Sequence, residues 1–142
     1  MDSNDLRPEY QDAVRATASG VLLYVAIFGP ALIATMAGLA ASFQRGVSRL
    51  ALLLIGVMFG AAFFGAVRVA HAHQVQAVKE EMMQTEAEMM DYSSDTGVVF
   101  APFVQPVLGL AYCSVVAGAS FFAGFLTTSF SGTKRSDAEL MQ

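Results

Sequence analysis

An uninterrupted apolar run from Leu50 to Val67 constrains the fold of this chain more than any other feature. Arginine stands on either side of it, and no polar residue occurs inside it. A stretch of about 20 apolar residues is what a helix needs to cross the hydrocarbon core of a bilayer. Only 14% of the 142 residues are charged, whereas a soluble domain usually carries about 25%. The sequence therefore indicates a membrane protein, and its length predicts a single domain.

Two further apolar stretches give the predicted architecture, an all-α membrane protein with three transmembrane helices. The spans are expected at residues 21–43, 50–70 and 106–128, with a polar lead at 1–16 and a polar tail at 131–142. Residues 98–105 are also apolar, but Pro102 and Pro106 punctuate them. They are expected either to lie at the membrane interface as a short extended piece or to belong to the third span.

A short basic turn at residues 44–49 joins the first two spans. Gly46 suits a helix C-cap and Ser48 suits the next N-cap, so the first two spans are predicted to form a helical hairpin. Arg45 and Arg49 lie in this turn, and Lys134 and Arg135 follow the third span on the same predicted side. The positive-inside rule then places the turn in the cytoplasm, matrix or stroma.

The second span is expected to continue out of the bilayer as a long acidic helix reaching Tyr92, within a stem at residues 71–97. Apolar residues recur at helical spacing along it, with Thr85 as the one polar exception. The stem is rich in acids and has Lys79 as its one cation. Several of these acids would lie near the helix C-terminus, where the helix dipole disfavours negative charge.

Such a stem is predicted to be held by a basic surface of another protein subunit. Its apolar residues would add packing that methionine tolerates well. The residues expected to bind this partner are Val75, Val78, Glu80, Glu81, Met82, Glu86, Glu88 and Met89.

Small and basic residues near the spans suggest two further kinds of contact. Gly56 and Gly60 stand four residues apart in the second span, and such pairs let helix backbones approach closely. Gly38 in the first span and Gly118 in the third are expected to act in the same way. The arginines at the span ends, Arg45, Arg49 and Arg68, are expected to contact lipid headgroups.

The polar residues give no pattern of catalysis or of metal and cofactor binding. His71 and His73 stand two positions apart, so on a helix they point roughly 200° apart and do not share one ion. No carboxylate lies within a predicted span, and Cys113 sits in the middle of the third. We therefore expect no enzyme activity, no metal and no cofactor. A net charge of −4 disfavours nucleic acid as a partner.

These features favour a structural, non-catalytic accessory subunit of a large multi-subunit membrane complex. The expected setting is an energy-transducing assembly, namely a respiratory complex, an ATP synthase or a photosynthetic complex, in the inner membrane of a mitochondrion or plastid. Other membrane subunits and lipids would be its partners. The alternative is a small channel, carrier or membrane scaffold formed by homo-oligomerisation through Gly56 and Gly60. An enzyme acting on lipids within the membrane has the least support.

Overall fold

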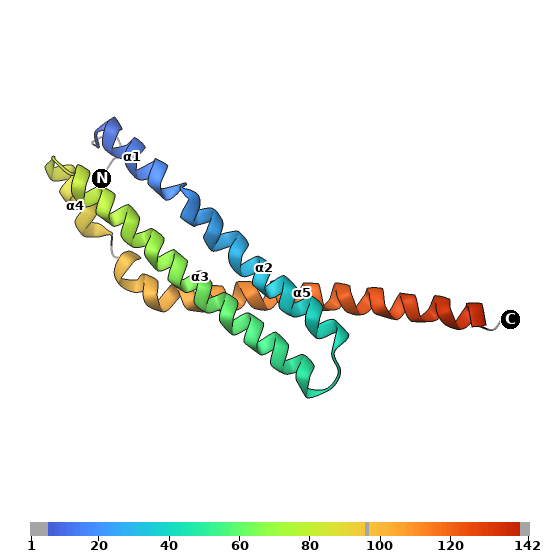
Figure 1. The fold of residues 1–142 in the computed structure, drawn as a ribbon. Helices are drawn as coiled ribbons and strands as arrows, with labels where there is room; N and C mark the ends of the chain where they lie inside the picture. The colour runs from blue at the N-terminus through green and yellow to red at the C-terminus, as the bar shows by residue number, and fades with distance from the viewer. Residues whose placement is uncertain (1–5, 96, 140–142) are drawn as a thin grey trace.

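The computed structural model describes residues 6–95 and 97–139 of the chain and is all-helical over them. It contains the helices α1 Pro8–Ala18, α2 Val21–Phe43, α3 Val47–Met82, α4 Glu86–Ser94 and α5 Gly97–Glu139 (Figure 1). Three helical segments are long and apolar enough to cross a membrane, and they include α2, α3 and the part of α5 up to Ser129 respectively. The expectation of an all-helical integral membrane protein is thus confirmed at this level.

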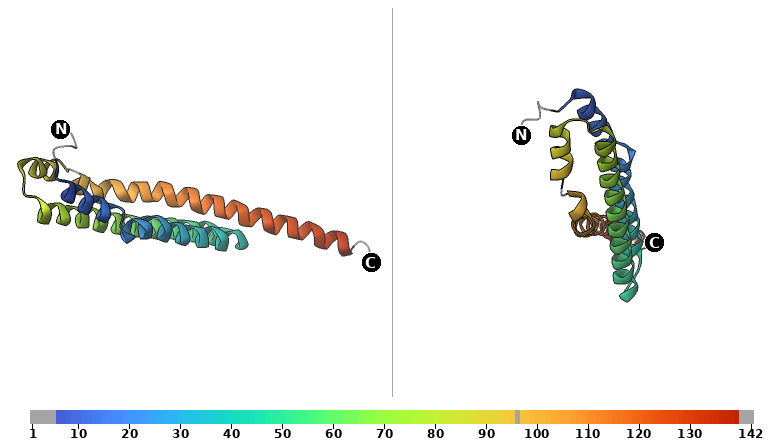
Figure 2. Two further views of the ribbon diagram at one scale, coloured as in Figure 1. Left: turned by 90° about the horizontal axis from the view of Figure 1, so that it is seen from above. Right: turned by 90° about the vertical axis from the view of Figure 1, so that its left-hand side faces the viewer.

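The three long helices form one bundle. Helices α2 and α3 run antiparallel as a hairpin, and α5 crosses them and contacts both. Helix α5 then continues past the hairpin turn, so its C-terminal part extends beyond the rest of the chain (Figures 1 and 2). The short helices α1 and α4 lie at the other end, where α1 packs on α3.

Close helix contacts in the bundle depend on small residues. A Cβ atom at Gly56 would collide with the Cβ of Ala37 on α2. A Cβ at Gly60 would come within 2.8 Å of the Sγ of Cys113 on α5. Because α2 and α5 occupy the face that carries Gly56 and Gly60, this face lies inside the bundle and is not available to a second copy of the chain.

The other two glycines expected at helix contacts behave differently from each other. A Cβ at Gly38 would overlap the carbonyl oxygen of Ala117, so α2 and α5 meet there backbone to backbone. Around a Cβ at Gly118 there is nothing within 4 Å. Gly118 therefore makes no helix contact within the chain, because it lies on the outward side of α5.

Pro30 is buried within α2, where its missing N–H leaves the carbonyl of Ala26 without its helical partner. The hydroxyl of Tyr112 on α5 donates a hydrogen bond of 3.0 Å to the carbonyl of Ile27, the next residue along α2. Cys113 follows Tyr112 and is fully buried with Ala34 and Ala117. Tyr112 thus connects α5 to α2 beside the proline.

The hairpin turn uses its residues differently from the prediction. Gly46 has a φ of 67° and is the N-cap of α3, not the C-cap of α2, and Ser48 lies inside α3. Only a residue without a Cβ adopts this left-handed conformation without strain. The end of α2 is closed by Arg49, whose guanidinium donates two hydrogen bonds, of 3.1 and 2.8 Å, to the carbonyl of Gln44.

The predicted long acidic helix to Tyr92 was wrong. Helix α3 ends at Met82, and the chain turns back on itself as the separate helix α4. Thr85 is the N-cap of α4, and it forms a capping box with Glu88, in which each side chain bonds the other residue's backbone N–H. Glu86 and Glu88 therefore lie in the first turn of a helix, where the helix dipole favours negative charge, and not near the end of a long one.

Residues 98–105 are helical. They form the start of α5, which accommodates both Pro102 and Pro106 within the helix. Of the two arrangements that the sequence left open, a short extended piece is therefore excluded.

Candidate functional site: a polar cap and an adjoining cleft

A cluster of charged side chains joins α1, α3 and α4 at the end of the bundle away from the hairpin turn. We call it the polar cap. It consists of Arg7, Tyr10, Lys79, Glu88, Asp91 and Asp95.

Arg7 and Glu88 form the centre of the polar cap. The Nε of Arg7 lies 2.8 Å from Oε1 of Glu88, and the same guanidinium donates to the carbonyl of Met82 at 2.8 Å. A third bond, of 2.9 Å, runs to the side chain of Gln84. Arg7 therefore hydrogen-bonds both to the end of α3 and to the turn into α4, although it precedes Glu88 by 81 positions in the sequence.

Glu88 is fully buried and its carboxylate is fully surrounded by donors. Besides Arg7, it accepts hydrogen bonds from the backbone N–H groups of Gln84 at 2.7 Å and Thr85 at 3.1 Å. The hydrogen bond from Arg7 is the main cause that lowers the pKa of Glu88 to about 2, and the backbone bonds act in the same direction against burial. The carboxylate is therefore charged at every physiological pH.

Lys79 connects α3 to α4 by two ion pairs. Its ammonium lies 3.0 Å from a carboxylate oxygen of Asp91 and 3.0 Å from one of Asp95. Burial works against the charged form of Lys79, but the hydrogen bonds that its ammonium donates to the two carboxylates outweigh it, and the pKa of Lys79 is raised. The lysine is thus held in its charged form between the two acids.

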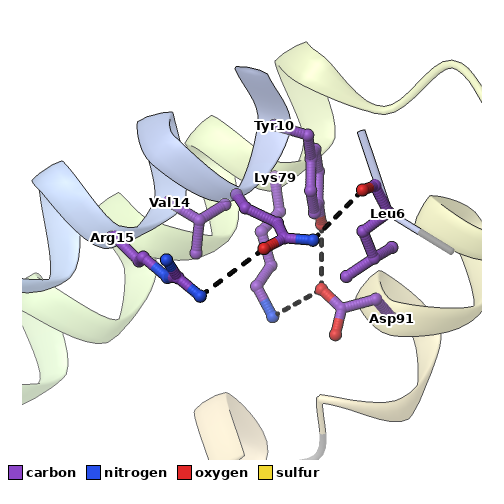
Figure 3. A pocket seen from close by; sticks show the side chains of 7 residues that line it. Leu6, Tyr10, Val14, Arg15, Lys79 and Asp91 are labelled. Atoms are coloured by element: carbon purple, nitrogen blue, oxygen red, sulfur yellow. Dashed lines mark hydrogen bonds and ion pairs between the residues drawn. The ribbon is translucent and has the colours of Figure 1, made fainter. Parts of the chain in front are cut away.

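Tyr10 brings α1 into the same network. Its ring is buried and its hydroxyl donates a hydrogen bond of 2.9 Å to Asp91. Burial, supported by this bond, raises the pKa of Tyr10. A pocket of about 220 Å³ opens beside Tyr10, Lys79 and Asp91, with Val14 and Arg15 of α1 on its rim (Figure 3).

His71 binds the end of α1, at the point where the chain passes from α1 to α2. It is 8% exposed, and its Nε2 lies 3.1 Å from the carbonyl oxygen of Ala18, the last residue of α1. Carbonyl groups at a helix end have no partner within the helix, so the imidazole N–H supplies one. His71 therefore has a structural role that its position in the sequence did not reveal, whereas His73 is exposed.

A cleft of about 280 Å³ lies next to the polar cap, where α3 meets the start of α5. Arg68, His71 and Val75 line it from α3, and Val98, Ala101 and Gln105 from α5. Asp95 stands at its edge. The Nε of Arg68 is 3.5 Å from the side-chain oxygen of Gln105, a long hydrogen bond.

The residues expected to bind a partner fall into three groups in the structure. Glu88 is sealed inside the polar cap by Arg7 of the same chain, so its assignment to a partner surface was wrong. Val75, Val78 and Met82 are half-buried against this chain. The exposed members are Glu80, Glu81, Glu86 and Met89.

The arginines expected at lipid headgroups also differ from one another. Arg49 is engaged with Gln44 and lies over the ring of Phe121, 5.2 Å from its centroid. Arg45 is exposed beside the hairpin turn. Arg68 is half-buried and lies in the cleft beside Gln105.

The role of Arg7 was not predicted from the sequence, in which Lys79 was the one cation assigned to the acids of the stem. The sequence does carry one signal, because Thr85 and Glu88 have the spacing of a capping box and thereby mark a helix start. A break there brings α4 back toward α1, which places Glu88 within reach of Arg7.

Among the described residues, no group of three or more His, Cys, Asp or Glu side chains is placed to hold a metal ion. In the same part of the chain, every buried side-chain nitrogen and oxygen has a hydrogen-bond partner. The arrangement of the polar cap is thus that of a structural clamp. Comparisons with protein-family models, with curated proteins and with solved structures gave no match.

Proposed function

We propose that this chain is a non-catalytic structural subunit of a larger membrane assembly, and that α5 is the helix through which it joins its neighbours. The observation that carries this proposal is the outward position of Gly118, around whose missing Cβ there is nothing within 4 Å. Membrane helices associate by close contact between small residues, since lipid tails give them no hydrophobic driving force.

The surroundings of Gly118 support this assignment. Ala111 and Ser114 stand seven and four residues before it on α5 and are also exposed, so a shallow strip of small residues runs along the outer side of the helix. The C-terminal part of α5 extends beyond the α2–α3 hairpin (Figure 1). An isolated helix gains little stability from propensity alone, so a neighbouring chain would stabilise this part of α5.

The exposed acids of the stem add a second contact outside the membrane. Glu80, Glu81 and Glu86 remain on the surface after the polar cap has formed, with Met89 exposed nearby. A basic surface of a partner subunit fits them, and its attraction would weaken with salt. The proposed setting is an energy-transducing complex in the inner membrane of a mitochondrion or plastid, where small accessory subunits with a few spans are common.

The second candidate function is a small homo-oligomeric channel, carrier or scaffold. Gly56 and Gly60 are not available for contact between copies of the chain, because the face that carries them packs inside the bundle. A homo-oligomer would therefore have to use the outward face of α5 that carries Gly118. The same experiment separates the two candidates.

The test is native gel electrophoresis of the protein from its own membrane in mild detergent, with mass spectrometry of the co-migrating proteins. We compare Gly118→Leu with Ala123→Leu, because Ala123 is also exposed on α5 but lies about 140° around the helix. The proposal expects co-migration with different proteins, lost in Gly118→Leu and kept in Ala123→Leu.

Three outcomes would overturn the proposal. A homogeneous complex containing only this chain supports the homo-oligomer. Migration as a single chain shows that the chain has no partner. Equal behaviour of both variants shows that the outward face of α5 does not bind one. Gly60→Leu serves as a reference for a chain whose own bundle is disrupted, because its Cβ position is already crowded by Cys113.

A further inference from the structure

The cleft between α3 and α5 separates a positive group from a negative one. Arg68 stands at the end of the second predicted span, and Asp95 lies in the link between α4 and α5, outside the predicted spans. Both line the same volume of about 280 Å³. The positive group therefore lies on the membrane side of the cleft and the negative group on its water side.

Arg68 has unused capacity for an anion. A guanidinium has five N–H donors in a planar fork. Among the described residues, Arg68 uses them in one hydrogen bond, the contact of 3.5 Å with Gln105, and forms no ion pair. Because the oxygen of Gln105 faces Arg68, its amide N–H₂ is left to donate to the same anion. At this depth in a membrane, the abundant anion is a lipid phosphate.

Asp95 has unused capacity for a cation. The polar cap contains the cations Arg7 and Lys79 but three carboxylates, and Lys79 is shared between Asp91 and Asp95. The cap thus has one negative charge in excess. Only Oδ2 of Asp95 contacts Lys79, and Oδ1 has no hydrogen bond among the described residues. Asp95 is the member of the cap that lines the cleft.

We propose that this cleft binds the headgroup of a zwitterionic phospholipid with a primary amine, that is, a phosphoethanolamine headgroup. The phosphate accepts hydrogen bonds from Arg68 and Gln105, and the ammonium donates to Asp95. The order of the charges matches that of such a lipid in a bilayer, whose phosphate is attached to the glycerol and whose amine lies further toward water. His71 is occupied with Ala18 and forms a wall of the site.

The size and lining of the cleft agree with this ligand. Phosphoethanolamine has about eight non-hydrogen atoms, which need at most about 240 Å³ if each takes the roughly 30 Å³ share of a liquid water. Recognition of a quaternary choline group uses the faces of Trp, Tyr or Phe rings, and none of the described residues lining the cleft is a Trp, Tyr or Phe. A quaternary ammonium also has no N–H to donate to Asp95. The apolar residues Val98 and Ala101 suit the adjoining glycerol backbone.

The test is native mass spectrometry of the full chain in mild detergent, titrated with phospholipids that share dioleoyl chains and carry ethanolamine, choline or glycerol headgroups. The ethanolamine lipid is expected to bind best. Arg68→Gln is expected to weaken its binding by about tenfold or more, since a hydrogen bond to a charged group contributes at least that much. Arg45→Gln, an exposed arginine at the other end of the bundle, is the control and should leave binding unchanged.

A second pair of variants tests the amine. Asp95→Asn and Asp91→Asn each remove one carboxylate from Lys79, but only Asp95 lines the cleft. We expect Asp95→Asn to lower binding of the ethanolamine lipid to the level of the choline lipid, and Asp91→Asn to preserve the preference. Unchanged binding of the choline lipid by the variants shows that the bundle is folded.

Three results would overturn the proposal. Equal binding of the three lipids shows that the cleft does not recognise the headgroup. A preference for the glycerol lipid that Asp95→Asn does not alter assigns the cleft to an anionic lipid. Binding of soluble O-phosphoethanolamine without retention of any lipid assigns it to a free phosphorylated amine.

Discussion

The contact between Gly60 and Cys113 allows a quantitative test of bundle packing. In Gly60→Ala the new Cβ would lie 2.8 Å from the Sγ of Cys113 and 3.5 Å from the carbonyl oxygen of Pro30. Non-bonded heavy atoms prefer a separation of about 3.5 Å or more. The contact with the carbonyl is therefore ordinary, and the contact with the sulfur is too short by about 0.7 Å.

The sulfur has no space to withdraw, because Cys113 is completely buried and its single side-chain torsion has few staggered positions in a helix. Inserting a methyl group into a packed site costs about 1–3 kcal/mol. Gly118→Ala is the matched control, since it makes the same change in α5 without a neighbour within 4 Å. It should be neutral or up to about 1 kcal/mol more stable through helix propensity.

The free energy of unfolding should be measured by titration with SDS in mixed micelles, followed by far-UV circular dichroism. We expect Gly60→Ala to be less stable than Gly118→Ala by about 1–3 kcal/mol. In a Cys113→Ala background the sulfur is absent and the new methyl group enters its space, so the loss of stability caused by Gly60→Ala should largely disappear. The difference between the two backgrounds is the coupling energy of the two residues. If Gly60→Ala costs the same in both backgrounds, or matches Gly118→Ala, the packing described here is wrong.

Three further predictions concern the polar cap and the topology. Acid should loosen α4 as the pH falls from about 4.5 toward about 2, because folding lowers the pKa of Glu88, so that its contribution to stability is full above this range and is lost through it. Hydrogen exchange of α4 should detect this loss, and Glu88→Gln should flatten the pH dependence. His71→Ala should speed hydrogen exchange at the end of α1 and lower the free energy of unfolding by about 1 kcal/mol, because it removes the hydrogen-bond partner of a helix-end carbonyl. His73 is exposed, so equal effects of His71→Ala and His73→Ala would contradict this role of His71. Cysteines introduced at exposed Arg45 and Glu86 should be labelled from opposite sides of the membrane, and labelling from the same side would exclude the proposed arrangement of spans.

Much of the bundle was predictable because its signals are local. The run from Leu50 to Val67 and the other apolar stretches identify three helices by composition alone. Small residues such as Gly56 and Gly60 indicate close contact, but their spacing does not say which helix they face. Contact with α2 and α5 inside the chain, and the outward direction of Gly118, depend on how the three helices are rotated about their axes.

The polar cap was not predictable in the same way. Periodicity through Val75, Val78 and Met82 continues across the end of α3, so counting apolar positions gave one long helix. The capping signal at Thr85 was read as a flaw in that pattern, although it marks the start of α4. The cation that pairs with Glu88 is Arg7, which lies far away in the sequence. A pair over such a distance can be predicted only once the turn at residues 83–85 is known.

The pair of Arg7 and Glu88 also bears on how the chain enters the membrane. Arg7 precedes α2 and Glu88 follows α3, so the two side chains meet only when the first two spans have been threaded in opposite directions. A chain whose first span was inserted the wrong way round would leave Arg7 across the bilayer from Glu88. It would then carry a carboxylate without its guanidinium, and α3 would lack the group that closes its end. The ion pair thus forms only when the first two spans cross the membrane in opposite directions, and during biogenesis it would favour insertion of the two spans as a hairpin.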